Sequence, residues 1–286
     1  MIYICADDYG ISAKTCRQIN ECAACGAVNK ISVLPNTEVK DIQQYIPKQG
    51  VTLGAHINLV EGRPLSPPES VRMLLDKRGC FKYSFPGLFL RTLLPGRKKF
   101  TKQIYTEIKS QLAAYKQLDS DSTTAIDSHQ HTHMIPAVFK ALMRAVRDEG
   151  IQVRYLRMPA EPIWPYLRQP GLYITYRPIN LVKQGLLKLL GRLHRAKLQQ
   201  SGIQTAIFMG VLFSGHMDAA RVKKVLPHYI RLAEKKGMDI ELLFHPGHTE
   251  SGDAVMDDKK KGFNRFYAAG GRKTEYNTLQ ALDISF

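Results

Sequence analysis

The feature that most constrains the fold is a regular alternation of apolar, β-branched runs with segments of helical periodicity. Strands are expected near residues 1–6, 28–34, 51–59, 123–129, 151–157, 204–213 and 239–245. Helices are expected from Ser12 to Gly26, near 37–46, and over 100–118, 136–150, 181–200, 217–237 and 274–283. Strands separated by helices pair in parallel through right-handed crossovers. The sequence therefore predicts an α/β fold, most simply a distorted or incomplete barrel of about seven parallel strands; an open doubly wound sheet is the alternative.

The length of 286 residues suits one large α/β domain, which we expect to cover residues 1–286. Two long insertions interrupt the pattern, near 61–99 and 158–200. The first is rich in Pro, Gly and Arg, and residues 158–180 hold five prolines. A loop as long as 61–99 in a compact domain is often functional, for example as a lid.

Several classes of protein are disfavoured by composition. No run of about 18 apolar residues is present, and the N-terminus lacks the zones of a signal peptide, so we expect a cytoplasmic protein. The five cysteines are scattered, which favours reduced thiols, and Cys22 and Cys25 are interpreted as small core residues rather than a redox pair.

The chain is strongly basic, with 41 Lys+Arg against 25 Asp+Glu and a net charge of +16. Such a surface favours polyanions, anionic lipids or acidic sugars. No nucleic-acid-binding motif is visible, so nucleic acid is not expected as a partner. The basic helix at 181–200 is either an ordinary packed helix with a solvated face or a weak contact for an anionic membrane.

Acidic and histidine side chains follow several of the predicted strands. Asp7 and Asp8 end the first strand, His56 ends the third, and His245 ends the last. In parallel α/β folds the carboxyl ends of the strands form the active-site face. Adjacent carboxylates repel unless a cation lies beside them, so the Asp pair indicates a metal or base more than a simple helix cap. The structural alternative for His56 is a hydrogen-bonded core histidine. The alternative for His245 is a histidine that happens to lie in a turn.

The run 127–133, Asp-Ser-His-Gln-His-Thr-His, is the strongest local signal. In a strand, Asp127, His129 and His131 share a face, and Asp127 could orient a ligating imidazole through its second nitrogen. In a helix, His129 and His133 would share a face instead. A polar loop that happens to hold three histidines is the remaining alternative.

Arg157 ends the fifth strand, where it could pair with an acid of the site or bind substrate. We expect His131 and His133 to contact substrate as well. The alternative for Arg157 is an ordinary surface ion pair.

Four motifs occur in an order that resembles the YdjC-like carbohydrate deacetylases, the chito-oligosaccharide deacetylase family. They are Ala6-Asp7-Asp8-Tyr9-Gly10, Leu53-Gly54-Ala55-His56-Ile57-Asn58-Leu59 with Glu61-Gly62-Arg63-Pro64-Leu65, the 127–133 run, and Glu241 through His245-Pro246-Gly247. The ending Arg272-x-x-Glu275 with Leu279 and Leu282 is also similar. The sequence departs from the family at Cys16, where an Asn is common, and in its longer, basic 158–200 segment.

The resemblance implies a polysaccharide-deacetylase-like barrel with one divalent metal, Mg²⁺ or Zn²⁺. It places the metal ligands on Asp8, His56 and His129, the general base on Asp7 and the proton donor on His245. The implied reaction is removal of an N-acetyl group from an amino sugar, and a homodimer would suit the family.

Three other functions remain open at this stage. The substrate could be lipid-linked or otherwise anionic, which the basic helix would suit. A glycosidase would use paired carboxylates but needs no histidine cluster. A non-catalytic carbohydrate-binding barrel would keep the fold without metal or turnover.

Overall fold

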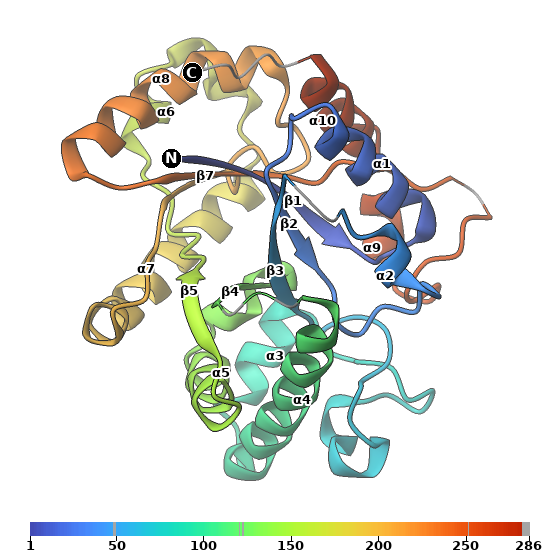
Figure 1. Ribbon diagram of the computed structural model, residues 1–286. Helices are drawn as coiled ribbons and strands as arrows, with labels where there is room; N and C mark the ends of the chain where they lie inside the picture. The colour runs from blue at the N-terminus through green and yellow to red at the C-terminus, as the bar shows by residue number, and fades with distance from the viewer. Residues whose placement is uncertain (48–49, 120, 122, 251, 282–286) are drawn as a thin grey trace.

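The fold is a single parallel sheet of seven strands that curls into an incomplete barrel, as Figure 1 shows. The computed structural model describes residues 1–47, 50–119, 121, 123–250 and 252–281. In this part of the chain the sheet order is β5-β4-β3-β2-β1-β7-β6. The strands are β1 (Ile2–Tyr9), β2 (Lys30–Val33), β3 (Thr52–Ile57), β4 (Thr123–Ser128), β5 (Gln152–Leu156), β6 (Ile207–Met209) and β7 (Ile240–Phe244).

The two edges of the sheet meet at one point. A parallel bridge pairs Tyr155 of β5 with Gln204, just before β6, and the backbone N–H of Leu156 donates to the Gln204 carbonyl at 3.0 Å. The incomplete barrel predicted from the sequence is confirmed, and the open doubly wound sheet is not the observed arrangement.

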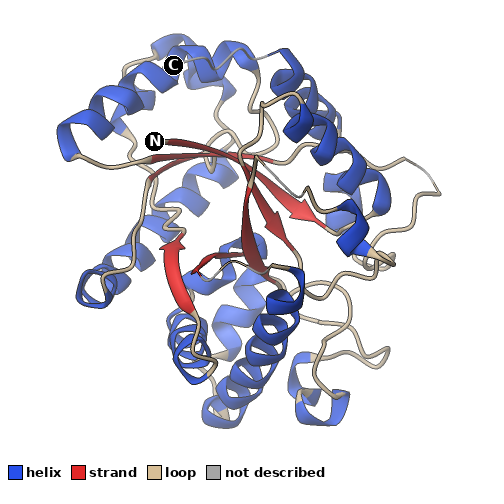
Figure 2. Cartoon of the chain, in the orientation of Figure 1, coloured by secondary structure: helices blue, strands red, loops and turns tan. Residues whose placement is uncertain are grey.

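Helices pack around the outside of the sheet (Figure 2). The crossovers and flanks are formed by α1 (Ala13–Ala24), α2 (Ile42–Tyr45), α4 (Arg97–Leu118), α5 (Pro136–Asp148), α8 (Ala219–Lys236) and α10 (Gly270–Ala281). Ser12 caps α1 as expected, because its hydroxyl accepts from the Thr15 N–H at 3.1 Å. The core lies between the sheet and these helices, and each large aliphatic side chain buried there contributes about 1.5–3 kcal/mol.

Three segments predicted as loops contain short helices. The 61–99 insertion holds η1 (Pro68–Ser70), η2 (Arg72–Leu74) and α3 (Phe85–Arg91), and α4 begins at Arg97 rather than at residue 100. Residues 158–180 hold α6 (Trp164–Leu167) and η4 (Pro170–Thr175), and the basic helix is α7 (Pro178–Ser201). The lysine-rich loop contains α9 (Lys261–Tyr267). Isolated helices this short are marginal in water, and each is too short to show helical periodicity in the sequence, so the sequence did not reveal them.

Two further observations bear on the predictions, one on the last helix and one on membrane-spanning segments. The last helix ends at Ala281, and the rest of its predicted range, with Leu282, lies outside the described residues. None of the helices in the described ranges is long and apolar enough to cross a membrane.

Candidate active site

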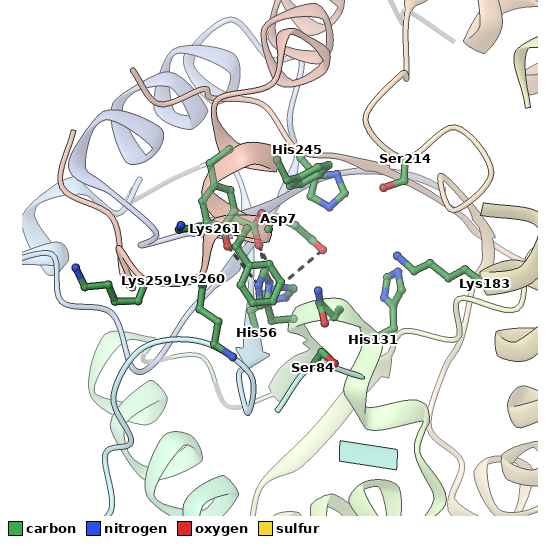
Figure 3. Close-up of a pocket in the computed structure, with 17 residues that line it drawn as sticks. Asp7, His56, Ser84, His131, Lys183, Ser214, His245, Lys259, Lys260 and Lys261 are labelled. Atoms are coloured by element: carbon green, nitrogen blue, oxygen red, sulfur yellow. Dashed lines mark hydrogen bonds and ion pairs between the residues drawn. The ribbon is translucent and has the colours of Figure 1, made fainter. Parts of the chain in front are cut away.

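A pocket of about 600 Å³ opens at the carboxyl ends of the strands (Figure 3). Several elements that are distant in sequence contribute to it. Its lining comprises Asp7, Asp8, His56, Ser84, His129, Gln130, His131, Lys183, Ser214, His245, Lys259, Lys260, Lys261, Gly262, Phe263, Phe266 and Tyr267.

An irregularity in β1 brings both aspartates into this pocket. Neighbouring residues of a regular strand point to opposite faces. The pairing of β1 with β2 shifts between Ala6 and Tyr9, and Asp8 has a left-handed backbone with φ of 68°. A non-glycine residue in that conformation costs about 1–3 kcal/mol and is typical of functional sites.

Asp8, His56 and His129 form a compact group of potential metal ligands. One ligand atom from each lies within 4.8 Å of the others. Asp8 Oδ1 is 2.9 Å from His129 Nδ1 and 3.6 Å from His56 Nε2. His56 Nε2 is buried and has no hydrogen-bond partner among the described residues, whereas buried polar atoms normally have one. A carboxylate and two imidazoles, one of them with an orphaned ring nitrogen, fit a divalent cation.

Each of these three side chains is held from behind by a second polar group. His56 Nδ1 lies 2.6 Å from Asp127 Oδ1, and His129 Nε2 lies 3.4 Å from Glu61 Oε2. Such outer contacts fix the ring orientation and tautomer of metal-ligating histidines.

Asp8 is held by a cation from the C-terminal helix. Arg272 Nη1 donates to Asp8 Oδ2 at 2.9 Å, and its Nε donates to the Gly247 carbonyl at 2.6 Å. Burial would raise the pKa of Asp8, but His129, His56 and Arg272 hold that pKa well below its ordinary value. Asp8 therefore remains ionised and pre-positioned.

Beneath the pocket lies a buried group of five charged side chains, here called the charged floor: Lys30, Arg157, Asp7, Asp127 and Glu241. Arg157 is its centre, with Nη1 2.6 Å from Asp7 Oδ2 and Nη2 2.8 Å from Asp127 Oδ2 and 2.9 Å from Glu241 Oε1. Lys30 Nζ contacts Glu241 Oε1 at 2.7 Å. Three carboxylates thus share two cations, which compensates for the desolvation of all five groups.

His131, His133, Arg157 and His245 occupy different places around the pocket. His131 and His245 line it, whereas His133 and Arg157 do not. Both ring nitrogens of His133 are used within the fold, by Ser128 Oγ at 2.6 Å and the Arg157 carbonyl at 2.9 Å. Arg157 is fully buried in the charged floor.

The electrostatics of the pocket wall differ from those of the candidate metal ligands. Burial lowers the pKa of His131 well below its ordinary value, so its imidazole is neutral. Burial also lowers the pKa of Lys183, whose amine points toward the pocket near His131 in Figure 3. Lys183 forms no ion pair with the described residues, and it lines the pocket together with Asp7 and Asp8, whose charges act on it.

Sequence reasoning missed most of the outer wall. Glu61 and Arg272 appear in the family motifs without an assigned role, and Lys183 belongs to the helix predicted either to pack with a solvated face or to contact an anionic membrane. The run Lys259-Lys260-Lys261 was visible as charge, but nothing in the sequence places it beside strand ends. The aromatic spacing Phe263, Phe266 and Tyr267 is the one signal that could have indicated a helix facing the site.

Comparisons with known proteins agree with this architecture. The model of the YdjC-like protein family matches residues 1–284. A carbohydrate deacetylase from Mus musculus is 28% identical over 254 residues, covering 86% of this chain and 78% of that protein. One from Thermoanaerobacter pseudethanolicus is 29% identical over 194 residues, covering 66% and 74%. A crystal structure described as a cellobiose-phosphate cleavage protein from Enterococcus faecalis V583 has a TM-score of 0.62 at 16% identity, covering 97% and 94%, which supports the fold alone.

Proposed function

Because the chain belongs to the YdjC-like protein family, we propose that it is a metal-dependent N-deacetylase of an amino sugar or chito-oligosaccharide. The products are acetate and a free amine. The observation that carries the proposal is the convergence of Asp8, His56 and His129 beside Asp7 at the bottom of one pocket. The relatives named carbohydrate deacetylases support the reaction type.

A divalent ion would be held by Asp8, His56 and His129. When bound, it polarises the acetyl carbonyl, acidifies water and neutralises the developing oxyanion. Of the two ions expected from the sequence, Zn²⁺ suits two imidazoles and a carboxylate better than Mg²⁺, which prefers an all-oxygen shell. His56 Nε2, free of any partner in the described chain, is the donor atom that most needs an ion.

Asp7 is the proposed general base. It lines the pocket next to the ligands, and Arg157 donates to both of its oxygens, at 2.6 and 2.8 Å. The charge of Arg157 is shared with Asp127 and Glu241, so Arg157 orients Asp7 and leaves lone pairs on the Asp7 oxygens available to accept a proton. Asp7 then accepts the proton of the attacking water.

His245 is the proposed proton donor to the leaving amine. Its backbone N–H donates to Glu275 Oε2 at 2.5 Å, and its ring lies edge-on to Phe266 with centroids 5.5 Å apart. Its Nδ1 has no hydrogen-bond partner among the described residues and lies 3.6 Å from Glu275 Oε2. As the amide C–N bond breaks, a proton from His245 completes the free amine.

Substrate contacts are proposed on the wall of the pocket. His131 offers a neutral imidazole, and the aromatic side chains of α9 offer apolar surface for a sugar ring. His133 and Arg157, expected from the sequence to bind substrate, are proposed to act as positioning residues because their polar atoms are engaged inside the fold.

A second candidate substrate is an amino sugar that carries an anionic group. Lys183 and Lys260 both line the pocket, and burial lowers the pKa of each. Neither ammonium group forms an ion pair with the described residues, and desolvated ammonium groups of this kind favour an anionic ligand. A homodimer remains a prediction from the family resemblance.

The test is acetate release from N-acetylated chito-oligosaccharides by the purified protein. Release should stop after chelation, return with Zn²⁺ or Mg²⁺, and be absent in Asp8→Asn. Asp148→Asn, which changes an exposed carboxylate of α5 outside the pocket, is the matched control.

Other outcomes separate the alternatives. Metal binding without release would redirect the search to anionic or lipid-linked acetylated sugars. Neither metal binding nor release would favour a carbohydrate-binding barrel. Cleavage of glycosidic bonds without acetate would favour a glycosidase and contradict the proposal.

A further inference from the structure

The helix α7 carries an exposed apolar stripe formed by Ile179, Val182, Leu186, Leu189 and Leu193. Its steps of three and four residues place all five side chains within an arc of about 80° on an α-helix. Four of them are largely exposed: Ile179 at 69%, Val182 at 68%, Leu189 at 55% and Leu193 at 62%. Leu186 packs against a core cluster, but the other four side chains are additional to the buried face of the helix, so core packing does not explain their exposure.

The stripe lies beside a second apolar element at the pocket. Leu186 of α7 and Phe85 and Phe89 of α3 pack against the same small core cluster. Just beyond them, α3 and its exit expose Leu90 and Leu93, each at 58%. The exposed apolar side chains of these two elements, which share one core cluster, are here called the α3–α7 surface.

The α3–α7 surface adjoins the mouth of the pocket. Lys183, one turn before Leu186, lines the pocket, and so does Ser84 at the start of α3. A partner covering this surface would consequently lie at the entrance to the site.

Only positive charge accompanies this apolar surface. Residues 77–106 contain eight Lys or Arg and no Asp or Glu, and residues 162–217 contain seven Lys or Arg and no Asp or Glu. On α7, Arg192 borders the stripe on the helix surface, and Lys188 and Arg195 lie farther round the same helix. Apolar side chains bordered by lysine and arginine are typical of a helix that lies in the headgroup region of a membrane.

We infer that the α3–α7 surface docks the protein on an anionic lipid bilayer. The apolar stripe would enter the headgroup boundary while the basic side chains contact lipid phosphates. A second copy of the chain is a poorer partner, because it would bring the same basic side chains, and a net charge of +16, against this surface. The inference rests on exposure and charge and does not depend on the proposed deacetylase activity.

Co-sedimentation with vesicles tests the inference. The protein should sediment with vesicles of equal parts phosphatidylcholine and phosphatidylglycerol at low salt, but not with phosphatidylcholine alone. High salt should release it, since the attraction to anionic headgroups is screened.

Two double variants divide the apolar contribution from the electrostatic one. Val182→Gln with Leu189→Gln should weaken vesicle affinity about tenfold or more, because two aliphatic side chains lose their burial. Lys188→Gln with Arg192→Gln should weaken it about fivefold per charge.

Matched controls lie near α1 and α2, on the opposite side of the molecule from α7 (Figure 1). Tyr45→Gln removes an exposed apolar side chain, and Arg17→Gln with Lys40→Gln removes the same net charge as the basic variant. The first control should bind vesicles as the unmodified protein does, and the second should weaken binding only slightly. Circular dichroism melts verify that each variant folds.

Three results would overturn the inference. They are no sedimentation with anionic vesicles at low salt, undiminished binding of the Val182/Leu189 variant, or a change from dimer to monomer in that variant by sedimentation velocity. The last would identify a second copy as the partner. Acetate release measured on a soluble substrate should be unchanged in every variant, so failure of docking is distinguishable from failure of the proposed function.

Discussion

Two buried carboxylates, Asp127 and Glu161, lie in regions with different partners, and their pKa values shift in opposite directions. Both are fully buried, and burial by itself raises the pKa of each. In the charged floor, Arg157, His56 and Lys30 hold the pKa of Asp127 well below its ordinary value. Burial raises the pKa of Glu161 to about 7, even though neutral donors surround it.

The contacts of Glu161 explain the difference. Its oxygens accept from the Gly210 and Leu212 N–H groups at 2.7 and 2.9 Å and from the Tyr166 hydroxyl. It forms no salt bridge with any residue in the described ranges. Neutral dipoles satisfy hydrogen bonds but do not replace a full counter-charge. Carboxylates of the charged floor therefore stay ionised because cations lie beside them. Glu161 instead connects the loops after β5 and β6 through hydrogen bonds that it can accept whether or not it is charged.

Removing Arg157, the central cation of the charged floor, should have the largest effect on stability. Arg157→Met leaves Asp7, Asp127 and Glu241 without their shared partner, so we expect a loss of about 3–5 kcal/mol in the free energy of unfolding. Urea denaturation measures it. Arg147→Met, whose side chain is 75% exposed beside Asp148, is the control and should change stability little. A loss at Arg157 no larger than the control's would show that the floor does not need its arginine.

The pH dependence of stability should report on the ionisation of Glu161. Because the pKa of Glu161 is raised from about 4.5 to about 7, the folded state favours its protonated form. Its contribution is fully present below pH 4.5 and is lost as pH rises through 7, a change of about 3 kcal/mol.

The measurement for Glu161 is the difference between wild type and Glu161→Gln in unfolding free energy across pH 4 to 8. The glutamine adds a constant offset but cannot titrate, so only the slope is informative. The contribution of Asp127 to the unfolding free energy changes with pH in the opposite direction, because its lowered pKa gives stability that is lost on acidification. Parallel curves for wild type and variant would contradict the assignment to Glu161.

Metal affinity should separate the two carboxylates. Asp127→Asn removes the charged partner of His56 Nδ1, and we expect metal affinity or activity to fall about 10–100-fold. Glu161→Gln touches no candidate ligand and should leave metal affinity unchanged. Competition with a fluorescent chelator measures both variants. Equal losses would mean that the effect is general loosening of the fold rather than orientation of His56.

The smallest effects concern two tyrosines. The Tyr155 hydroxyl donates to Glu241 and the Tyr166 hydroxyl to Glu161. Tyr155→Phe should cost about 1 kcal/mol, since Glu241 keeps Arg157 and Lys30, whereas Tyr166→Phe should cost about 2 kcal/mol. Urea denaturation of the two variants checks the order. A greater loss for Tyr155→Phe would contradict the view that cations outweigh neutral donors at the floor.

The fold could be predicted because its signals are local. A strand at 1–6 and a helix capped by Ser12 follow from periodicity and cap chemistry within a few residues. The same logic places Asp7, Asp8, His56, His129 and His245 at strand ends, and the structure puts all five at one pocket. Their roles in chemistry remain proposals.

The missed features are those that local pattern does not encode. Nothing near His56 identifies Asp127, 71 residues away, as its partner, and nothing near Asp8 identifies Arg272, 264 residues away. The helix α9 was predicted as a loop because seven residues carry too little periodicity, although Tyr267 of α9 is buried beside Met256, Ile11 and Leu34.

The sequence by itself therefore determined the alternation of strands and helices, the chemistry at the strand ends and the excess of positive charge. Only the tertiary structure decided which buried charges pair, that Arg157 and His133 face inward, and that an apolar stripe stays exposed beside the pocket. The physical reason is range. Backbone periodicity and capping act over a few residues, whereas desolvation and ion pairing depend on groups that the folded sheet brings together from distant parts of the chain.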